Sequence, residues 1–95
     1  MGERVYAVRF KRSVARDLRH LDVSERLRVR AAIHERLAVD PRRGKRLSGI
    51  READTNRPLW SYRAGDYRIV YVFSETELWL LVVRVGHRRA VYDGL

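Results

Sequence analysis

Apolar and polar residues follow two kinds of pattern along this chain. Residues 4–10 alternate with a period of two, which predicts a half-buried strand. Two segments with apolar residues at helical spacing come next, and they predict two amphipathic helices. The apolar positions of the first segment are Val14, Leu18 and Leu21, and those of the second are Val29, Ile33 and Leu37.

The ends of the two helices have recognisable signals. Ser13 is of the residue type that caps a helix, so we expect it to begin the first one. Asp22 and Glu25 have the spacing of a capping box at the start of the second helix. Proline disfavours helix at the residue before it, so Asp40-Pro41 is expected to end that helix.

The second half of the chain has a different pattern. Residues 42–58 show no clear periodicity, and such a long irregular stretch in a small domain is typical of a functional loop. Strands are predicted at 59–63, 67–74 and 77–85, with turns at Gly65-Asp66 and near Glu75-Thr76. Turns this short make neighbouring strands antiparallel.

The predicted fold class is therefore α+β, in the order β-α-α-β-β-β. We expect both helices to pack on one face of a small antiparallel sheet and to leave its other face uncovered. Tyr67, Ile69 and Tyr71 alternate with Arg68 and Val70. The bulkier set is expected to face the helices, so Arg68 would lie on the uncovered face.

Composition narrows the possible functions. The 95 residues suit one domain, 1–95, and the chain has no cysteine, which excludes disulfides and thiolate metal sites. No signal peptide or membrane span is evident, so we expect a cytoplasmic protein with no membrane partner. The net charge is +9, and only Lys11 and Lys45 of the 21 basic residues are lysines. Such a basic domain attracts nucleic acid or an acidic protein.

Arginines in strand-like surroundings indicate an anion site. If Gly65-Asp66 forms a two-residue turn, Arg63 and Arg68 face each other across the strands, where like charges repel. An arriving phosphate would relieve that repulsion. Arg84 ends the last predicted strand, and its face depends on the strand register. The tail that follows adds further candidates, which are His87, Arg88, Arg89 and Tyr92.

These side chains suit metal-free cleavage of RNA by its own 2′-hydroxyl. Attack on the phosphorus builds negative charge that fixed cations stabilise. Imidazole titrates near neutral pH, so His87 is a candidate for proton transfer, and Tyr92 is a second one if neighbouring arginines lower its pKa. No carboxylate pair or His/Asp cluster suggests a metal, and nothing indicates a cofactor.

Each candidate also has a plainer interpretation. Arg68 could be an ordinary solvated charge on a sheet face, and Arg63 could pair with Asp66 or Glu77. His87 could be structural, as a lone histidine near a strand end often is. Tyr92 could pack as an aromatic lid.

Three segments resemble the RelE/ParE superfamily of bacterial toxin–antitoxin toxins. They are Asp40-Pro-Arg with the basic loop after it, Arg63-x-Gly-Asp-Tyr-Arg-Ile-Val-Tyr71, and Val83-Arg-Val-Gly-His-Arg-Arg-x-Val-Tyr92. An early pattern, Phe10…Ala15-x-Asp-Leu18…Leu21, extends the likeness over essentially the whole chain. The likeness is greater to the RelE branch, whose toxins cut mRNA in the ribosomal A site, than to the ParE branch, which poisons DNA gyrase.

The resemblance assigns roles to three residues. Arg68 matches the arginine that holds the scissile phosphate, Arg88 matches a second arginine, and Tyr92 matches a tyrosine used for proton transfer and stacking. The best-known RelE toxins carry two lysines on the strand where this chain has Leu59 through Tyr62. Here Lys45, Arg46 or Arg63 would have to supply that charge from nearby. Arg84 and Arg89 are expected to add RNA contacts.

The resemblance also implies partners. These are a RelB-like antitoxin, mRNA and ribosomal RNA in the A site, and operator DNA bound through the antitoxin. Our leading hypothesis is a ribosome-dependent mRNA endonuclease of a type II toxin–antitoxin pair. The alternatives are a ParE-type gyrase inhibitor without nuclease activity, and a non-toxic relative that only binds antitoxin or DNA.

Overall fold

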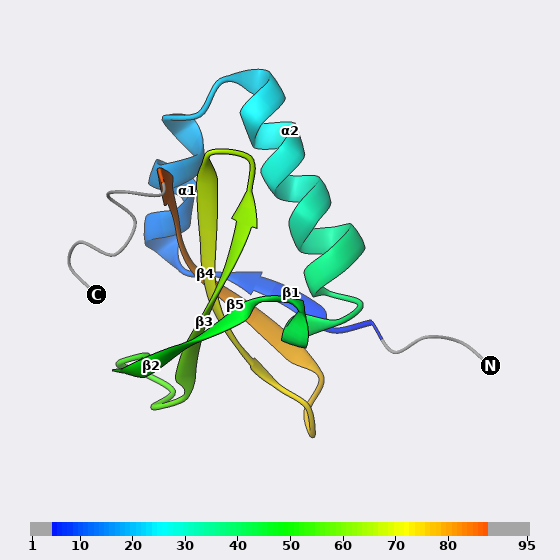
Figure 1. Ribbon diagram of the computed structural model, residues 1–95, viewed down its shortest axis with the longest axis vertical. Helices are drawn as coiled ribbons and strands as arrows, with labels where there is room; N and C mark the ends of the chain where they lie inside the picture. Colours follow the sequence, from blue (N-terminus) through cyan, green and yellow to red (C-terminus); the bar gives the residue numbers. More distant parts are fainter. Residues whose placement is uncertain (1–4, 88–95) are drawn as a thin grey trace.

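The computed structural model describes residues 5–87, which form two helices and a five-stranded sheet (Figure 1). The sheet order is β1-β5-β4-β3-β2. The strands are β1 (Ala7–Phe10), β2 (Lys45–Arg51), β3 (Pro58–Ala64), β4 (Tyr67–Ser74) and β5 (Trp79–His87). The helices are α1 (Arg12–Arg19) and α2 (Val23–Ala31), and α2 continues as a π-helical segment, Ala32–Leu37.

The α+β class is confirmed, but two details of the sheet were predicted wrongly. The sheet is mixed, because β1 pairs with β5 in parallel. The stretch 42–58 is also not one loop, since it contains the edge strand β2. Residues of β2 are mostly exposed, and its register with β3 shifts between Arg46 and Arg51, with Gly49 at φ 76°. An exposed, bulged edge strand does not show the period-two pattern that reveals a half-buried strand.

The helix starts were predicted correctly in one case out of two. Asp22 caps α2: its carboxylate accepts from the Glu25 N–H at 2.8 Å, and the Glu25 carboxylate accepts from the Asp22 N–H at 3.1 Å. Ser13 does not cap α1. The cap residue is Lys11, without a side-chain hydrogen bond, and the Ser13 hydroxyl donates to the Val83 carbonyl across to β5 instead.

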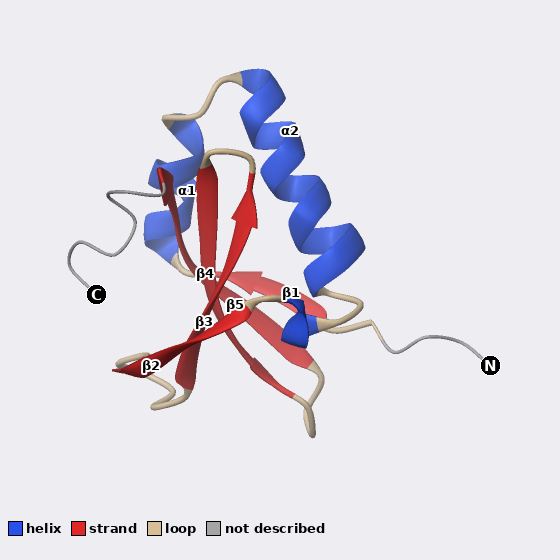
Figure 2. Ribbon diagram, in the orientation of Figure 1, coloured by secondary structure: helices blue, strands red, loops and turns tan. Residues whose placement is uncertain are grey.

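Both helices pack on one face of the sheet, as predicted (Figure 2). We call this the helix face. Ile69 and Tyr71 of β4 are fully buried there, which confirms the expected orientation of that strand. The buried residues that the helical segments contribute are Val14, Leu21, Val29, Ala32, Ile33 and Leu37, and those from β5 are Leu80, Val82 and Val85.

The opposite face is only half uncovered, which corrects the expectation of an open face. A second apolar cluster lies on it, and Leu47 of β2 packs against this cluster. Its buried members are Leu59, Val70, Val72 and Val83. Among the described residues of this face, Lys45 and Arg63 are exposed, and Trp79 and Leu81 near the start of β5 are partly exposed. We call this opposite side the open face.

The β3–β4 hairpin has the predicted two-residue turn. Ala64 pairs with Tyr67, which leaves Gly65-Asp66 as the turn, and Gly65 has φ 63°. Glycine adopts such a positive φ without steric cost. The Tyr67 hydroxyl donates to the Glu25 carboxylate at 3.3 Å, so the base of the turn is tied to α2. Burial, followed by the nearby Glu25 carboxylate, raises the pKa of Tyr67.

A buried tyrosine holds the connection that leads into β2. The Tyr71 hydroxyl donates to the Pro41 carbonyl and accepts from the Gly44 N–H. A Cβ added at Gly44 would lie 2.2 Å from that hydroxyl oxygen, so only glycine fits beside it. Burial raises the pKa of Tyr71 well above its usual range. This contact sets where β2 begins and therefore where Lys45 lies.

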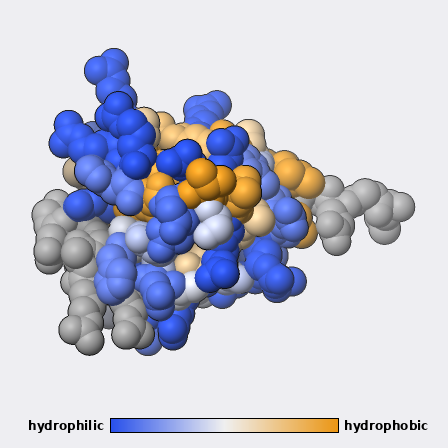
Figure 3. All heavy atoms as spheres, turned by 90° about the horizontal axis from the view of Figure 1, so that it is seen from above, coloured by the Kyte–Doolittle hydropathy of each residue, from blue (hydrophilic) through white to orange (hydrophobic). Residues whose placement is uncertain are grey.

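The surface around the helix pair is largely hydrophilic. Figure 3 views the molecule from the end where α1 and α2 meet, and a smaller apolar patch lies among the hydrophilic residues. Val23 and Leu27, one turn apart on α2, are 67% and 62% exposed. None of the helices within residues 5–87 is long and apolar enough to cross a membrane.

Candidate nucleic-acid interface

A row of directly opposite residues crosses four strands of the sheet. Lys45 on β2 lies opposite Ser61 on β3, Ser61 lies opposite Val70 on β4, and Val70 lies opposite Arg84 on β5. Opposite residues of an antiparallel pair point to the same face. Val70 belongs to the cluster on the open face, so Lys45 and Arg84 also belong to that face.

A second row lies next to the first, toward the hairpin turn. Arg63 on β3 faces Arg68 on β4, and Arg68 faces Gly86 on β5. Gly86 has no side chain, so β5 places no side chain directly opposite Arg68. The two rows bring four predicted site residues together on the open face. We call the part of the open face that these four residues form the cationic face. The four residues are Lys45, Arg63, Arg68 and Arg84.

The charges of this face are only partly compensated. Arg84 lies with its Nε 3.8 Å from the Asp17 carboxylate of α1. Arg63 does not pair with Asp66 or Glu77; its Nε donates to the Gly65 carbonyl at 3.0 Å. Among residues 5–87, Lys45 and Arg68 form no ion pair, and the Arg68 side chain is half-buried between its neighbours. Such an arrangement has a net attraction for anions.

Two predicted site residues lie on the helix face instead. His87 is opposite Tyr67, and their rings meet edge to face at 5.9 Å between centroids. Arg46 is opposite Trp60, which packs against the main core. The period-two alternation of a strand therefore separates Arg46 from Lys45 and His87 from Gly86. Arg88, Arg89 and Tyr92 lie outside the described residues.

A groove of about 440 Å³ opens on the open face beside the cationic face. Arg84 contributes to both, because it also lines the groove. The groove lies between the start of α1, the end of β2 with the turn after it, and strands β3 and β5. Its lining residues are Lys11, Ser13, Arg16, Asp17, Arg51, Glu52, Ala53, Leu59, Val83 and Arg84.

Sequence reasoning missed the groove residues Arg16, Asp17, Arg51 and Glu52. Arg16 and Asp17 lie on a helix whose apolar stripe explains its pattern without them, and Arg51 and Glu52 fall in the stretch predicted to be a loop. Their proximity comes from chain segments about 35 residues apart. A single sequence contains no signal for such a contact.

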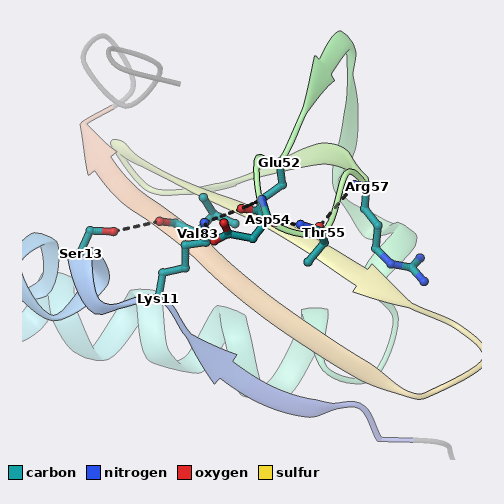
Figure 4. A network of polar contacts seen from close by, with 7 residues as sticks. All are labelled: Lys11, Ser13, Glu52, Asp54, Thr55, Arg57 and Val83. Carbon is teal, nitrogen blue, oxygen red and sulfur yellow. Dashed lines mark hydrogen bonds and ion pairs between the residues drawn. The ribbon is translucent and has the colours of Figure 1, made fainter.

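A network of polar contacts shapes one wall of the groove (Figure 4). The Glu52 carboxylate is buried, bonds to the Lys11 ammonium and accepts from the N–H groups of Asp54 and Thr55. Lys11 also pairs with the Asp54 carboxylate at 2.8 Å. Hydrogen bonds to the two carboxylates raise the pKa of Lys11. The turn after β2 is thereby fastened to the start of α1.

The pKa of Glu52 reflects two opposing effects. Burial alone would raise it, but the hydrogen bonds from Asp54, Lys11 and Thr55 outweigh burial and lower the pKa to about 2. The carboxylate is therefore charged at neutral pH and holds the charge of Lys11 in the network. Lys11 contributes less to the attraction of an outside anion than its place in the groove lining suggests.

The chemistry of this interface is the binding of anions. Guanidinium and ammonium groups donate hydrogen bonds to phosphate and stabilise negative charge, and guanidinium groups keep their protons throughout the physiological range. Within residues 5–87 no group of three or more His, Asp or Glu side chains could hold a metal ion. The four cations from four neighbouring strands thus suit a phosphate backbone laid across the sheet.

Comparison with known proteins identifies relatives of this chain. The family described as "ParE toxin of type II toxin-antitoxin system, parDE" matches residues 8–92. The toxin–antitoxin complex RelBE2 of Mycobacterium tuberculosis contains a similar chain, with 29% identity and a TM-score of 0.74 over 88% of this chain and 92% of that one. No curated protein sequence matches.

Two further structures share the fold. A chain of the RelE–RelB complex of Pyrococcus horikoshii OT3 is 20% identical, with a TM-score of 0.68 over 88% of this chain and 96% of that one. A chain of the RelBE complex of E. coli is 21% identical, with a TM-score of 0.66 over 86% and 95%. The family match covers most of the sequence and agrees with the α+β fold, so this chain belongs to the RelE/ParE superfamily and is the toxin of a type II toxin–antitoxin system.

Proposed function

We propose that this toxin is a ribosome-dependent mRNA endonuclease that inhibits translation. The observation that carries the proposal is the cationic face, where Arg63 and Arg68 face each other beside Lys45 and Arg84. Four cations on adjacent strands suit several consecutive phosphates of a single strand. Arg68 is half-buried and has no ion pair among residues 5–87, so it is the best placed to hold the scissile phosphate.

The proposed reaction needs no metal and balances within the RNA. The 2′-oxygen attacks the adjacent phosphorus as its proton leaves to a base, and the bond from phosphorus to the 5′-oxygen breaks. The products are a 2′,3′-cyclic phosphate and a 5′-hydroxyl, which receives a proton. Arg68 stabilises the charge that develops on the phosphorane oxygens. Arg88 is proposed to assist it, as the family resemblance implies.

Lys45 can take the place of the two lysines that the best-known RelE toxins carry on the strand equivalent to β3. It lies directly opposite Ser61, in the middle of the Leu59–Tyr62 segment. A long side chain reaches easily across to the neighbouring strand, so its ammonium can serve the same region of the open face. Arg63 adds a second cation from β3 itself.

Proton transfer is assigned to Tyr92 in this proposal. His87 was the other candidate, but it lies on the helix face against Tyr67, on the opposite side of the sheet from Arg68. Tyr92 comes from the same family motif as Arg88. The observation behind this assignment is therefore the position of His87 together with the motif.

The proposed partners follow from charge and family. The toxin would act in the cytoplasm on mRNA in the ribosomal A site, with Arg63, Arg84 and Arg89 contacting mRNA or ribosomal RNA. An RelB-like antitoxin would neutralise it and supply binding to operator DNA. The exposed Val23 and Leu27 of α2, on a chain of charge +9, suit an acidic partner with apolar residues.

The test is expression of the wild-type toxin and of Arg68→Ala, with mRNA ends mapped by primer extension. We expect wild type to arrest growth and to cut mRNA at codons in the A site. Arg68→Ala should lose both effects while circular dichroism and thermal unfolding show an intact fold. Full toxicity of the variant would contradict the assignment.

A ParE-type gyrase inhibitor is the second candidate, favoured by the description of the matching family. Induction would then cause DNA breakage and an SOS response while mRNA stays intact. Harmless overexpression of wild type would instead favour a non-toxic relative that only binds antitoxin or DNA. One induction experiment that follows mRNA ends and DNA integrity separates the three outcomes.

A further inference from the structure

The groove beside the cationic face is continuous with it through one residue. Arg84 lies in the row that begins at Lys45, and it also lines the groove together with Arg16 and Arg51. A strand of RNA that crosses the cationic face from Arg68 toward Arg84 therefore reaches the groove next. The groove volume of about 440 Å³ is in the range of pockets for small ligands.

The lining of the groove combines an apolar floor with a charged rim. Leu59 and Val83 form the floor and are 2% and 8% exposed. Arg16 is exposed on α1. One Arg51 nitrogen donates to the Asn56 carbonyl, and Arg51 forms no ion pair with any residue between 5 and 87. An apolar surface next to cations suits a base with its phosphate.

A hydrogen-bond acceptor also faces this space. Asp17 lines the groove, and its carboxylate is held in place because Oδ2 accepts from the Val85 N–H at 2.9 Å and lies near Arg84 Nε. Within residues 5–87 its contacts use Oδ2 alone, so Oδ1 can accept from a ligand. The amino groups of cytosine, adenine and guanine are donors that carboxylates bind.

We propose that this groove binds one nucleotide of single-stranded RNA next to the scissile phosphate and contributes to sequence preference. The inference rests on the proposed mRNA endonuclease and names a binding site for its substrate. Arg16 and Arg51 contact the phosphate, Leu59 and Val83 contact the base, and the Asp17 carboxylate accepts a hydrogen bond from it.

RNA fits the groove better than an acidic peptide does. The carboxylates of Asp17 and Glu52 belong to its lining, and they would repel the carboxylates of a peptide. Asp17 Oδ1 can accept a hydrogen bond, whereas the Glu52 oxygens already bond to Lys11, Asp54 and Thr55. A base offers Asp17 an amino group without a carboxylate, and the cations that bind its phosphate lie on the rim.

The test is binding of a fluorescent RNA hexanucleotide, 2′-O-methylated so that it cannot be cleaved, to the full-length toxin. Arg16→Glu removes a phosphate contact, and Ser13→Trp fills the groove without a change of charge. Arg19→Glu is the matched control, because Arg19 is also exposed in the last turn of α1 but does not line the groove. Anisotropy gives the Kd, and thermal unfolding verifies the fold of each variant.

We expect Arg16→Glu and Ser13→Trp to raise the Kd at least tenfold, and Arg19→Glu to raise it less than threefold. The slope of log Kd against log salt should fall by about 0.7 or more for Arg16→Glu, as for loss of one phosphate contact with single-stranded RNA. Equal effects of Arg16→Glu and Arg19→Glu would overturn the site, and so would unchanged binding in Ser13→Trp. It would be overturned too if a Glu-rich peptide of matched charge bound more tightly than RNA and lost more affinity in Arg16→Glu.

The outcome is separable from that of the proposed function. If wild type binds the hexanucleotide through the groove but ribosomal mRNA stays intact, the endonuclease proposal fails and the nucleotide site stands. If wild type cuts mRNA and the groove variants cut the same codons at the same rates, the site fails and the endonuclease stands. When both hold, Arg16→Glu changes the distribution of cut codons, whereas Arg19→Glu leaves it unchanged.

Discussion

Arg63 and Arg68 lie directly opposite each other across the β3–β4 hairpin, so two guanidinium groups share one end of the open face. Directly opposite residues have Cβ atoms about 4.5–5.5 Å apart, and like charges at that spacing destabilise a sheet. The hairpin is retained by its turn, by the contact of Tyr67 with Glu25 and by the core beneath it. The pair therefore places binding capacity at a position where stability alone would not favour it.

Removal of one charge from this pair should make the fold more stable, although it removes a cation that can bind an anion. We expect Arg63→Gln to raise the free energy of unfolding by about 0.2–1 kcal/mol, the usual range for a cross-strand pair. Arg36→Gln, an exposed change of equal charge on the helical segment, controls for the lower net charge. Urea unfolding at low salt gives the free energy of unfolding of wild type and of each variant. A loss of stability in Arg63→Gln would show that Arg63 holds the turn through Gly65 more than it repels Arg68.

For the endonuclease proposed above, Lys45 and Arg46 test which face of the sheet would bind mRNA. The two are adjacent in sequence, but they lie opposite Ser61 and Trp60 on different faces of the sheet. We expect Lys45→Gln to reduce mRNA cleavage about 10–100-fold, in line with the loss of about 1.4–2.7 kcal/mol of transition-state stabilisation, and Lys45→Arg to retain most of it. Arg46→Gln should change the rate less than threefold. Cleavage of a ribosome-bound message in vitro gives the rates, and equal losses in the two Gln variants would contradict the assignment.

The contact of Tyr71 with the Pro41–Gly44 connection should be important for stability. Tyr71→Phe leaves the buried Pro41 carbonyl and Gly44 N–H without their partner, which we expect to cost about 1–3 kcal/mol. Gly44→Ala should be similarly harmful, because its Cβ would overlap the same hydroxyl. Tyr62→Phe is the control, since Tyr62 is only partly buried. The midpoints of denaturant unfolding compare the variants, provided that the free energy of unfolding depends on denaturant concentration with the same slope in each. Equal midpoints for Tyr71→Phe and Tyr62→Phe would contradict the prediction.

Glu52 should make the stability of the protein depend on acidic pH. Its pKa is lowered from 4.5 to about 2 in the folded chain, so its stabilising effect is fully present above pH 4.5 and is lost as the pH falls toward 2. The loss amounts to about 3 kcal/mol at most, at about 1.4 kcal/mol per pKa unit. Unfolding followed from pH 6 to pH 2 should show a steeper decline for wild type than for Glu52→Gln.

Other carboxylates also contribute to acid sensitivity, so the comparison between the two chains is the decisive measurement. Asp22 in the capping box and Glu75 beside Arg42 have lowered pKa values as well, but both are exposed. Their contributions cancel between wild type and Glu52→Gln. If the free energies of unfolding of wild type and Glu52→Gln fell in parallel from pH 6 to pH 2, the lowered pKa of Glu52 in the folded chain would be contradicted.

Local patterns were sufficient for much of this fold. The spacing of Asp22 and Glu25 predicted the start of α2, because a capping box depends on residues three positions apart. Gly65-Asp66 between two alternating segments predicted the hairpin for the same reason. Ser13 misled, since its hydroxyl bonds to β5, a partner distant in sequence. The edge strand β2 was missed because its residues are exposed on most positions and carry no alternation.

For the candidate site, too, some features follow from the sequence and others only from the tertiary structure. The sequence by itself determined which residues carry positive charge, which segments form the helices and the β3–β4 hairpin, and that Arg63 faces Arg68, since these depend on near neighbours in the chain. Only the tertiary structure decided that Arg84 joins this pair, that His87 faces Tyr67, and that Arg16 and Arg51 meet at one groove. Those relationships depend on strand register and on contacts between distant segments. Both are set by the packing of the whole domain, and one residue of register reverses the face of every side chain on a strand.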